Sequence, residues 1–228
     1  GAAPGDPRRG EIPVELVRYY FSIEKIFQLY LYCGLMADYS TGFFEADFKE
    51  IAKDLKVSER HIYSCFNLLE KKDLVLVKKE NRKKYVFISP YPTETFSDPP
   101  IYNKEEELEQ LSKKYRSWIR KNKKKTEGKS QCFFFLPRSF LKCMTGEDKL
   151  SPGAIKLYVY CGIVMDKMKG YTLIGLDKMS KDLGVHKRTV SNWFMELNER
   201  KLIERHQMEF NGACCTHIMP YKIQTHKL

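Results

Sequence analysis

Apolar residues recur with helical spacing in the C-terminal part of the chain, after residue 150. Ser151 is suited to cap a helix at its start, and Pro152 is suited to the first helical position. We expect this helix to run from about residue 151 to 167. Its inward face comprises Ile155, Tyr158, Val159, Gly162 and Ile163.

Two more helices and a hairpin are predicted after it. A short strand or extended segment at 172–176 leads into a short helix that ends near Gly184. His186 or Lys187 begins the next helix, which ends near Lys201. Val190, Phe194 and Leu197 form the inward face of that helix. Two strands at 202–210 and 216–223 then flank Asn211-Gly212, a pair that favours tight turns because both residues tolerate positive φ.

The N-terminal part of the chain repeats this pattern 128 residues earlier. LYLYCGLMAD at 29–38 matches LYVYCGIVMD at 157–166, and about a third of the gapless pairs up to Val75 and Ile203 are identical. The repeat predicts helices at 21–38, 48–55 and 58–73, a short strand at 43–48, and strands at 74–80 and 85–91. Chance similarity does not explain an agreement of this length.

A charged segment connects the two copies. Residues 92–102 are proline-rich and extended, and a helix is predicted at about 103–123. Its acidic start and basic end complement the helix dipole. Because its apolar residues form one stripe, we expect this helix to dock on a domain. The stripe comprises Leu108, Leu111, Tyr115, Trp118 and Ile119.

These elements predict a mostly α fold with small β-hairpins, an α+β class. We expect a first domain at 11–91, a linker at 92–131 and a second domain at 132–228. Residues 1–10 are rich in Gly, Pro and Arg, and we expect them to be a disordered tail or a cloning remnant.

Composition indicates a folded, basic protein. Hydrophobic residues make up 43% and aromatic residues 13%, which excludes a disordered chain. The net charge of +11 favours a polyanionic partner such as nucleic acid, with an unspecific basic surface as the alternative. Most of the excess falls in the C-terminal third.

Cysteine usage and hydropathy bear on the compartment. The seven cysteines lack paired spacing, which argues against a disulfide framework and for a reducing environment. No apolar run reaches the roughly 18 residues of a membrane span, and the first residues lack the apolar stretch of a signal peptide. We therefore expect a cytoplasmic protein without membrane association.

Two segments carry a family resemblance. KDLKVSERHIYSCFNLLEKKDLV at 53–75 and KDLGVHKRTVSNWFMELNERKLI at 181–203 resemble the helix-turn-helix core of winged-helix DNA-binding proteins, such as GntR-like and MarR-like regulators. Two copies in one basic chain are similar to the replication initiators of plasmids and mobile elements. The resemblance implies two winged helix-turn-helix domains in tandem. No segment matches the effector-binding domain of GntR-like regulators, which disfavours a ligand-sensing repressor.

The sequence departs from the family at the turn between the last helix and the hairpin. The family commonly has glycine before the final Leu-Ile, and here Asp73 and Lys201 stand at that position. The turn must therefore differ, or a residue other than glycine must adopt the left-handed conformation.

The resemblance implies that the second helix of each motif enters the major groove of DNA. In the C-terminal copy, arginine suits guanine, asparagine suits adenine, and the threonine methyl suits thymine. Ordinary solvated surface is the alternative. The candidate residues there are His186, Lys187, Arg188, Thr189 and Asn192.

The N-terminal copy has a less basic helix and a more basic hairpin. Glu59 either accepts a hydrogen bond from cytosine or repels phosphate, so we expect a weaker reader. The candidates on this helix are Ser58, Arg60, His61 and Ser64. In the hairpin, Lys78, Lys79, Arg82, Lys83 and Lys84 are placed to neutralise phosphates. The lysine-rich stretch at 123–125 either lies near the DNA backbone or is a solvated linker.

We expect the remaining tryptophan, cysteine and tyrosine candidates to have packing roles. Trp193 is expected to pack in the core or between domains more than to contact DNA, and Cys33 and Cys161 are expected to be core residues. Adjacent Cys214 and Cys215 would point to opposite faces of a strand, so we expect no metal site. Four tyrosines also favour packing, with a tyrosine nucleophile for strand cleavage as the open alternative: Tyr30, Tyr32, Tyr158 and Tyr160.

The sequence thus predicts sequence-specific binding of double-stranded DNA, as a replication initiator of a plasmid or mobile element. The alternatives are a transcriptional regulator and a tandem winged-helix scaffold for protein assembly. No nucleotide-binding motif is present, and we expect neither a cofactor nor enzymatic activity. Expected partners are double-stranded DNA and, through the first domain, replication or transcription proteins, with the chain a monomer or homodimer.

Overall fold

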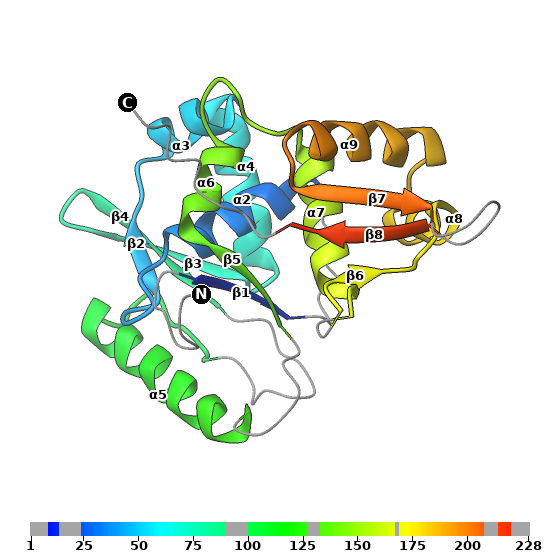
Figure 1. Ribbon diagram of the computed structural model, residues 1–228. Helices are drawn as coiled ribbons and strands as arrows, with labels where there is room; N and C mark the ends of the chain where they lie inside the picture. Colours follow the sequence, from blue (N-terminus) through cyan, green and yellow to red (C-terminus); the bar gives the residue numbers. More distant parts are fainter. Residues whose placement is uncertain are drawn as a thin grey trace, which may run out of the picture.

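The computed structural model describes residues 9–13, 24–89, 100–126, 133–166, 169–207 and 214–219. Within them, one order of elements occurs twice: helix, strand, two helices and two strands (Figure 1). The N-terminal unit comprises α2 (Glu24–Met36), β2 (Phe43–Glu45), α3 (Phe48–Leu55), α4 (Glu59–Lys71), β3 (Val75–Glu80) and β4 (Lys83–Ile88). The C-terminal unit comprises α7 (Pro152–Val164), β6 (Tyr171–Thr172), α8 (Leu176–Leu183), α9 (Lys187–Glu199), β7 (Ile203–Gln207) and β8 (Cys214–Ile218).

Each unit folds its three strands into an antiparallel sheet with the last strand in the middle. The orders are β2-β4-β3 and β6-β8-β7. The β3–β4 hairpin extends to the left in Figure 1, whereas β7 and β8 lie on the right. The predicted Asn211-Gly212 turn lies outside the described residues. The structure is therefore α+β with small antiparallel sheets, as expected for the fold class.

Local sequence signals set the helix ends. Ser151 caps α7, because its Oγ accepts a hydrogen bond from the Ala154 amide at 3.2 Å, and Pro152 takes the first turn. Helix α8 ends at Leu183, and its C-cap Gly184 has a φ of 66° in the left-handed region. These predictions are confirmed, although α7 ends at Val164, short of the expected residue 167.

The turn that lacks glycine uses a residue in the left-handed conformation. Asp73 and Lys201 have φ values of 54° and 53°. In both units a backbone hydrogen bond of 3.0 Å closes this turn, from Leu74 to Leu69 and from Leu202 to Leu197. The second alternative is thus confirmed, at a cost of roughly 1 kcal/mol per residue for the backbone conformation.

Paired tyrosines tie the first helix of each unit to its neighbours. The Tyr32 hydroxyl lies 3.2 Å from a carboxylate oxygen of Asp54, and Tyr160 lies 2.8 Å from the equivalent Asp182. Two more hydroxyls donate to the carbonyls that follow the last strand, from Tyr30 to Ser89 and from Tyr158 to Met219. The four tyrosines have the packing role that the sequence predicts.

The two units share one hydrophobic core. Every residue of 154–163 in α7 is buried, so this helix must be covered on all sides. The sequence predicted a single inward face, which is wrong because α2 packs against α7 and covers a second face. Cys33 and Cys161 are fully buried core residues, as predicted.

Two strands outside the repeated elements lie antiparallel to each other. β1 (Arg9–Pro13) pairs with β5 (Phe133–Pro137), with Glu11 opposite Phe135. Arg9 and Gly10 therefore belong to a sheet, and the tail predicted for 1–10 is wrong for these two residues, while 1–8 lie outside the described part. A 3₁₀ turn (Arg138–Phe140) and α6 (Leu141–Met144) follow β5.

Helix α5 (Leu108–Thr126) covers the outer face of the first sheet (Figure 1). Leu111 is fully buried against Leu76 and Phe87, which point to the opposite face from Val75 and Val86. The predicted docking is confirmed. The helix begins at 108 and not at 103, because residues 103–106 form a turn with a hydrogen bond from the Glu106 amide to the Asn103 carbonyl.

A pair of equivalent glycines tests this docking. Gly42 and Gly170 have φ values of 78° and 74°, but a Cβ at Gly42 would lie 2.5 Å from the Tyr115 ring of α5, whereas one at Gly170 would meet nothing within 4 Å. We expect Gly170→Ala to lower the free energy of unfolding by roughly 1 kcal/mol. Gly42→Ala should cost about 1–3 kcal/mol more, because the ring must move. Urea denaturation measures both, and equal losses would contradict the docking.

Candidate nucleic-acid interface

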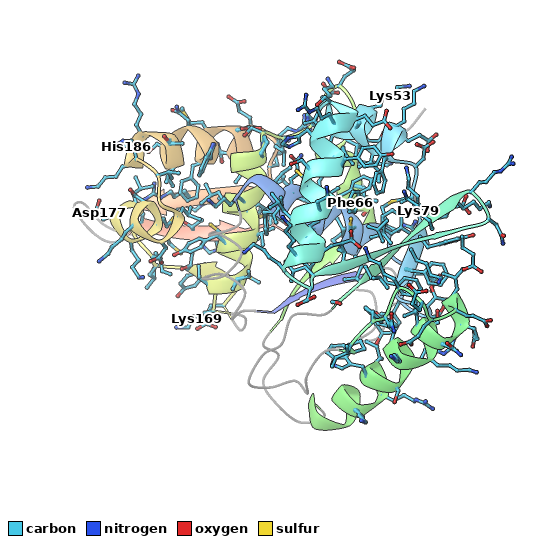
Figure 2. All side chains as sticks on the ribbon, turned by 180° about the vertical axis from the view of Figure 1, so that it is seen from behind. Lys53, Phe66, Lys79, Lys169, Asp177 and His186 are labelled. Atoms are coloured by element: carbon cyan, nitrogen blue, oxygen red, sulfur yellow. The ribbon has the colours of Figure 1, made fainter. Side chains whose placement is uncertain are left out.

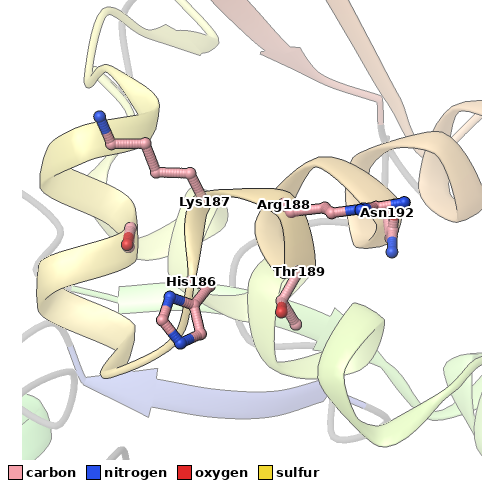
Figure 3. A pocket seen from close by; sticks show the side chains of 6 residues that line it. His186, Lys187, Arg188, Thr189 and Asn192 are labelled. Atoms are coloured by element: carbon pink, nitrogen blue, oxygen red, sulfur yellow. The ribbon is translucent and has the colours of Figure 1, made fainter.

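The five candidate residues of the C-terminal unit lie together around the start of α9. With Ser180 of α8 they line an open hollow of about 670 Å³ (Figure 3). His186, Lys187, Arg188 and Asn192 are exposed, and Thr189 is half-buried. Arg188 and Asn192 are four residues apart on α9 and share one face of it, whereas the Lys187 side chain points toward α8 (Figure 3).

Backbone geometry makes this hollow electropositive. His186 is the N-cap of α9, but its side chain makes no capping hydrogen bond, and the first turn of α9 contains no acidic residue. The positive end of the helix dipole therefore faces the hollow together with the side chains of Lys187 and Arg188. This arrangement suits a phosphate group or the edge of a base.

Lys187 is already paired on the protein surface. Its ammonium group contacts the Asp177 carboxylate in the first turn of α8, and both side chains are largely exposed. Asp177 and His186 lie at the same edge of the molecule in Figure 2. An exposed pair of this kind contributes little stability, so a phosphate can replace the carboxylate.

In the N-terminal unit, two of the candidate side chains have structural partners. The Ser58 Oγ accepts a hydrogen bond from the His61 amide at 3.1 Å and caps α4. The His61 Nε2 lies 3.3 Å from the Cys65 Sγ. Arg60 and Ser64 are exposed, and Glu59 places a negative charge in the first turn. This helix start is less suited to an anion than that of α9.

The basic hairpin is mostly strand. Only residues 81–82 form its turn, where Asn81 and Arg82 both have positive φ. The Lys78 ammonium donates to the Lys104 carbonyl at 2.9 Å. Lys83 pairs with Glu45 at 2.9 Å, and this hydrogen bond raises the pKa of Lys83.

Lys79 and Arg82 differ from the other hairpin cations. Both are exposed, and neither side chain forms a hydrogen bond or ion pair with another described residue. Figure 2 shows Lys79 at the edge of the molecule opposite to His186. The two cations at and beside the turn are thus the ones available to a polyanion.

Lys84 lies in an aromatic cradle, whereas the sequence predicted a phosphate contact for it. Its ammonium lies 4.3 Å from the centre of the Phe48 ring and 4.9 Å from that of Tyr63, and it contacts the Tyr63 hydroxyl at 2.8 Å. It therefore joins the hairpin to α3 and α4. An aromatic residue on the polar face of α4, Tyr63, was the signal in the sequence.

Trp193 has the packing role that the sequence favoured. A Cβ at Gly153 of α7 would lie 2.0 Å from its ring, so the ring occupies the space that this glycine leaves open. The neighbouring Glu196 accepts hydrogen bonds from the amide and hydroxyl of Ser151, both at 2.6 Å. These contacts fix α9 on the start of α7.

Side chains that could ligate a metal are scattered in the described part of the chain. No three or more His, Cys, Asp or Glu residues gather there as a metal site would require. Among the same residues, no helix is both long and apolar enough to span a bilayer. Cys215 and His217 lie on one strand with Sγ and Nε2 3.3 Å apart.

Part of the N-terminal unit is similar to a known protein family. Residues 44–91 match the model of a family described as sugar-specific transcriptional regulator TrmB. The match extends from β2 through α3, α4 and the β3–β4 hairpin. It indicates a helix-turn-helix DNA-binding domain of the transcription-regulator type. No curated protein matches the chain.

Alanine variants of two hairpin lysines distinguish a structural lysine from a solvated one. We expect Lys84→Ala to lower the free energy of unfolding by about 1 kcal/mol, because the cation leaves the rings of Phe48 and Tyr63. Lys79→Ala, on the same hairpin, should change it by less than about 0.5 kcal/mol. Urea denaturation of the two variants measures the free energy of unfolding. If Lys84→Ala leaves it unchanged, the cradle has no structural role.

Proposed function

We propose that the protein binds double-stranded DNA sequence-specifically through two winged helix-turn-helix units in tandem. The observation that carries the proposal is the gathering of Lys187, Arg188 and Asn192 in one open hollow at the start of α9. Helix α9 is then the main reader in the major groove, with Arg188 and Asn192 on base edges and Lys187 on phosphate. Lys79 and Arg82 supply phosphate contacts from the first hairpin.

The biological role is proposed as regulation of transcription. The family match to residues 44–91 supports this role over replication initiation. The initiator role, which the sequence favoured, rests on the resemblance to tandem winged-helix initiators alone. Both roles require the same DNA-binding step, so the test below applies to either.

A protein-assembly role for the N-terminal unit is the second candidate. Helix α4 exposes Tyr63 and Leu68, at 39% and 42%, where the equivalent positions of α9 are Ser191 and Glu196. Partly exposed apolar side chains of this kind suit a protein partner better than DNA. Under this reading the C-terminal unit holds the DNA and the N-terminal unit holds a replication or transcription protein.

We propose no catalytic step. A tyrosine nucleophile needs a hydroxyl that can lose its proton, but burial and then the neighbouring Asp54 raise the pKa of Tyr32. Burial and the hydrogen bond with Asp182 likewise raise the pKa of Tyr160. Tyr30 and Tyr158 direct their hydroxyls to backbone carbonyls.

The proposal predicts a salt-dependent and sequence-dependent affinity. Selection from a random pool of DNA duplexes should yield a motif, and its affinity should fall linearly with the logarithm of salt concentration. Arg188→Ala should weaken binding by about 1–3 kcal/mol and relax the preference at one base pair. Lys113→Ala, on the exposed face of α5, should change affinity less than about twofold. Failure to bind any DNA would exclude the proposal.

A further inference from the structure

A buried lysine fixes the turn between α8 and α9. Lys156 of α7 is 4% exposed, and its ammonium donates a hydrogen bond to the Leu183 carbonyl at 3.3 Å. Leu183 is the last residue of α8, and its carbonyl is one of those that the helix itself leaves without a partner. The lysine therefore holds the end of α8 just before the reading helix begins at Lys187.

The N-terminal unit lacks this lysine. There, the equivalent carbonyl accepts a hydrogen bond from a residue of the other unit. Gln28 stands at the position of Lys156, and its buried side-chain nitrogen has no hydrogen-bond partner among the described residues. The carbonyl equivalent to Leu183 belongs to Leu55, and it accepts a hydrogen bond of 2.5 Å from the ammonium of Lys149. Lys149 precedes α7 in the C-terminal unit.

A second contact lies beside the first. Lys56, the C-cap of α3, pairs with Glu147 at 3.0 Å. Lys56 has a φ of 53°, where the equivalent cap of α8 is Gly184. A side chain at this position lets the turn reach the C-terminal unit, which a glycine does not. Burial and then the charge of Lys56 lower the pKa of Lys149.

We propose that Lys149 is a positioning residue through which the C-terminal unit fixes the helix-turn-helix turn of the N-terminal unit, so that the two units contact DNA as one rigid pair. The packing of α2 against α7 gives this contact a stiff support. Leu150, next to Lys149, is buried, and its amide donates to the Cys143 carbonyl at 2.8 Å. The consequence for DNA, which rests on the proposed function, is a single preferred spacing between two contacted sequences.

Hydrogen exchange of the full chain without DNA tests the contact itself. In the α3–α4 turn, the Lys56 and Val57 amides are bonded to Lys53 and Ala52. We expect Lys149→Ala to speed their exchange about tenfold and to leave the equivalent Gly184 and Val185 amides unchanged. The control Lys142→Ala, on the exposed face of α6, should change neither turn. Unchanged exchange at Lys56 and Val57, or equal acceleration in both turns, overturns the proposal.

The repeat supplies a rescue. Adding Gln28→Lys to Lys149→Ala places a lysine where Lys156 stands in the other unit, and it should cap the Leu55 carbonyl from α2. We expect protection at Lys56 and Val57 to return. Its failure to return would show that the Leu55 carbonyl is not the group that Lys149 holds, which overturns the mechanism.

Binding to spaced duplexes tests the rigid pair. The probes carry the motif selected by the unaltered protein, with one to five base pairs inserted at its centre. One inserted base pair should weaken the unaltered protein about tenfold but Lys149→Ala less than about threefold. Gln28→Lys with Lys149→Ala should keep the tolerance of the single variant, because its cap no longer joins the units. Equal binding of all spacings by the unaltered protein overturns the rigid pair. If no DNA binds, the proposed function fails while the exchange result still decides the contact.

Discussion

The packing of α2 against α7 is the interaction on which the rest of the structure depends. Both helices are apolar over most of their surface, and neither finds enough cover within its own unit. In each unit, a tyrosine of this helix, Tyr30 or Tyr158, also donates a hydrogen bond to the carbonyl that follows the last strand. The orientation of one helix-turn-helix relative to the other therefore follows from this helix pair.

Local signals made much of the fold predictable. Ser151-Pro152 and Gly184 marked helix ends that the structure confirms, and the offset of 128 residues transferred each prediction to the other copy. What the sequence could not show was the relation between the copies. The spacing of apolar residues in α7 predicted a single inward face, and only three-dimensional packing identifies α2 as the cover of a second face.

The candidate site was predictable in type and less so in detail. The positions around Arg188 cluster as expected, because a helix start exposes them whatever the rest of the protein does. The partners of Lys84 and Lys149 were not predictable, since they lie on elements far away in the sequence. From composition alone, every lysine is a possible phosphate ligand. In the folded protein, a lysine beside an aromatic ring or a helix end has a structural role instead.

The family match and the basic start of α9 fall on different units, and this separation has a physical basis. Residues 44–91 contain the buried positions of a small-domain core, including Phe48, Leu55 and Phe66. Exposed residues carry the chemistry of recognition and contribute nothing to that packing. The C-terminal unit differs in one packing contact, Trp193 over Gly153, while its outer face carries residues suited to DNA. The similarity of a core to a family and the suitability of a surface for DNA are independent properties. In a duplicated fold, one copy can keep the first property and the other copy the second.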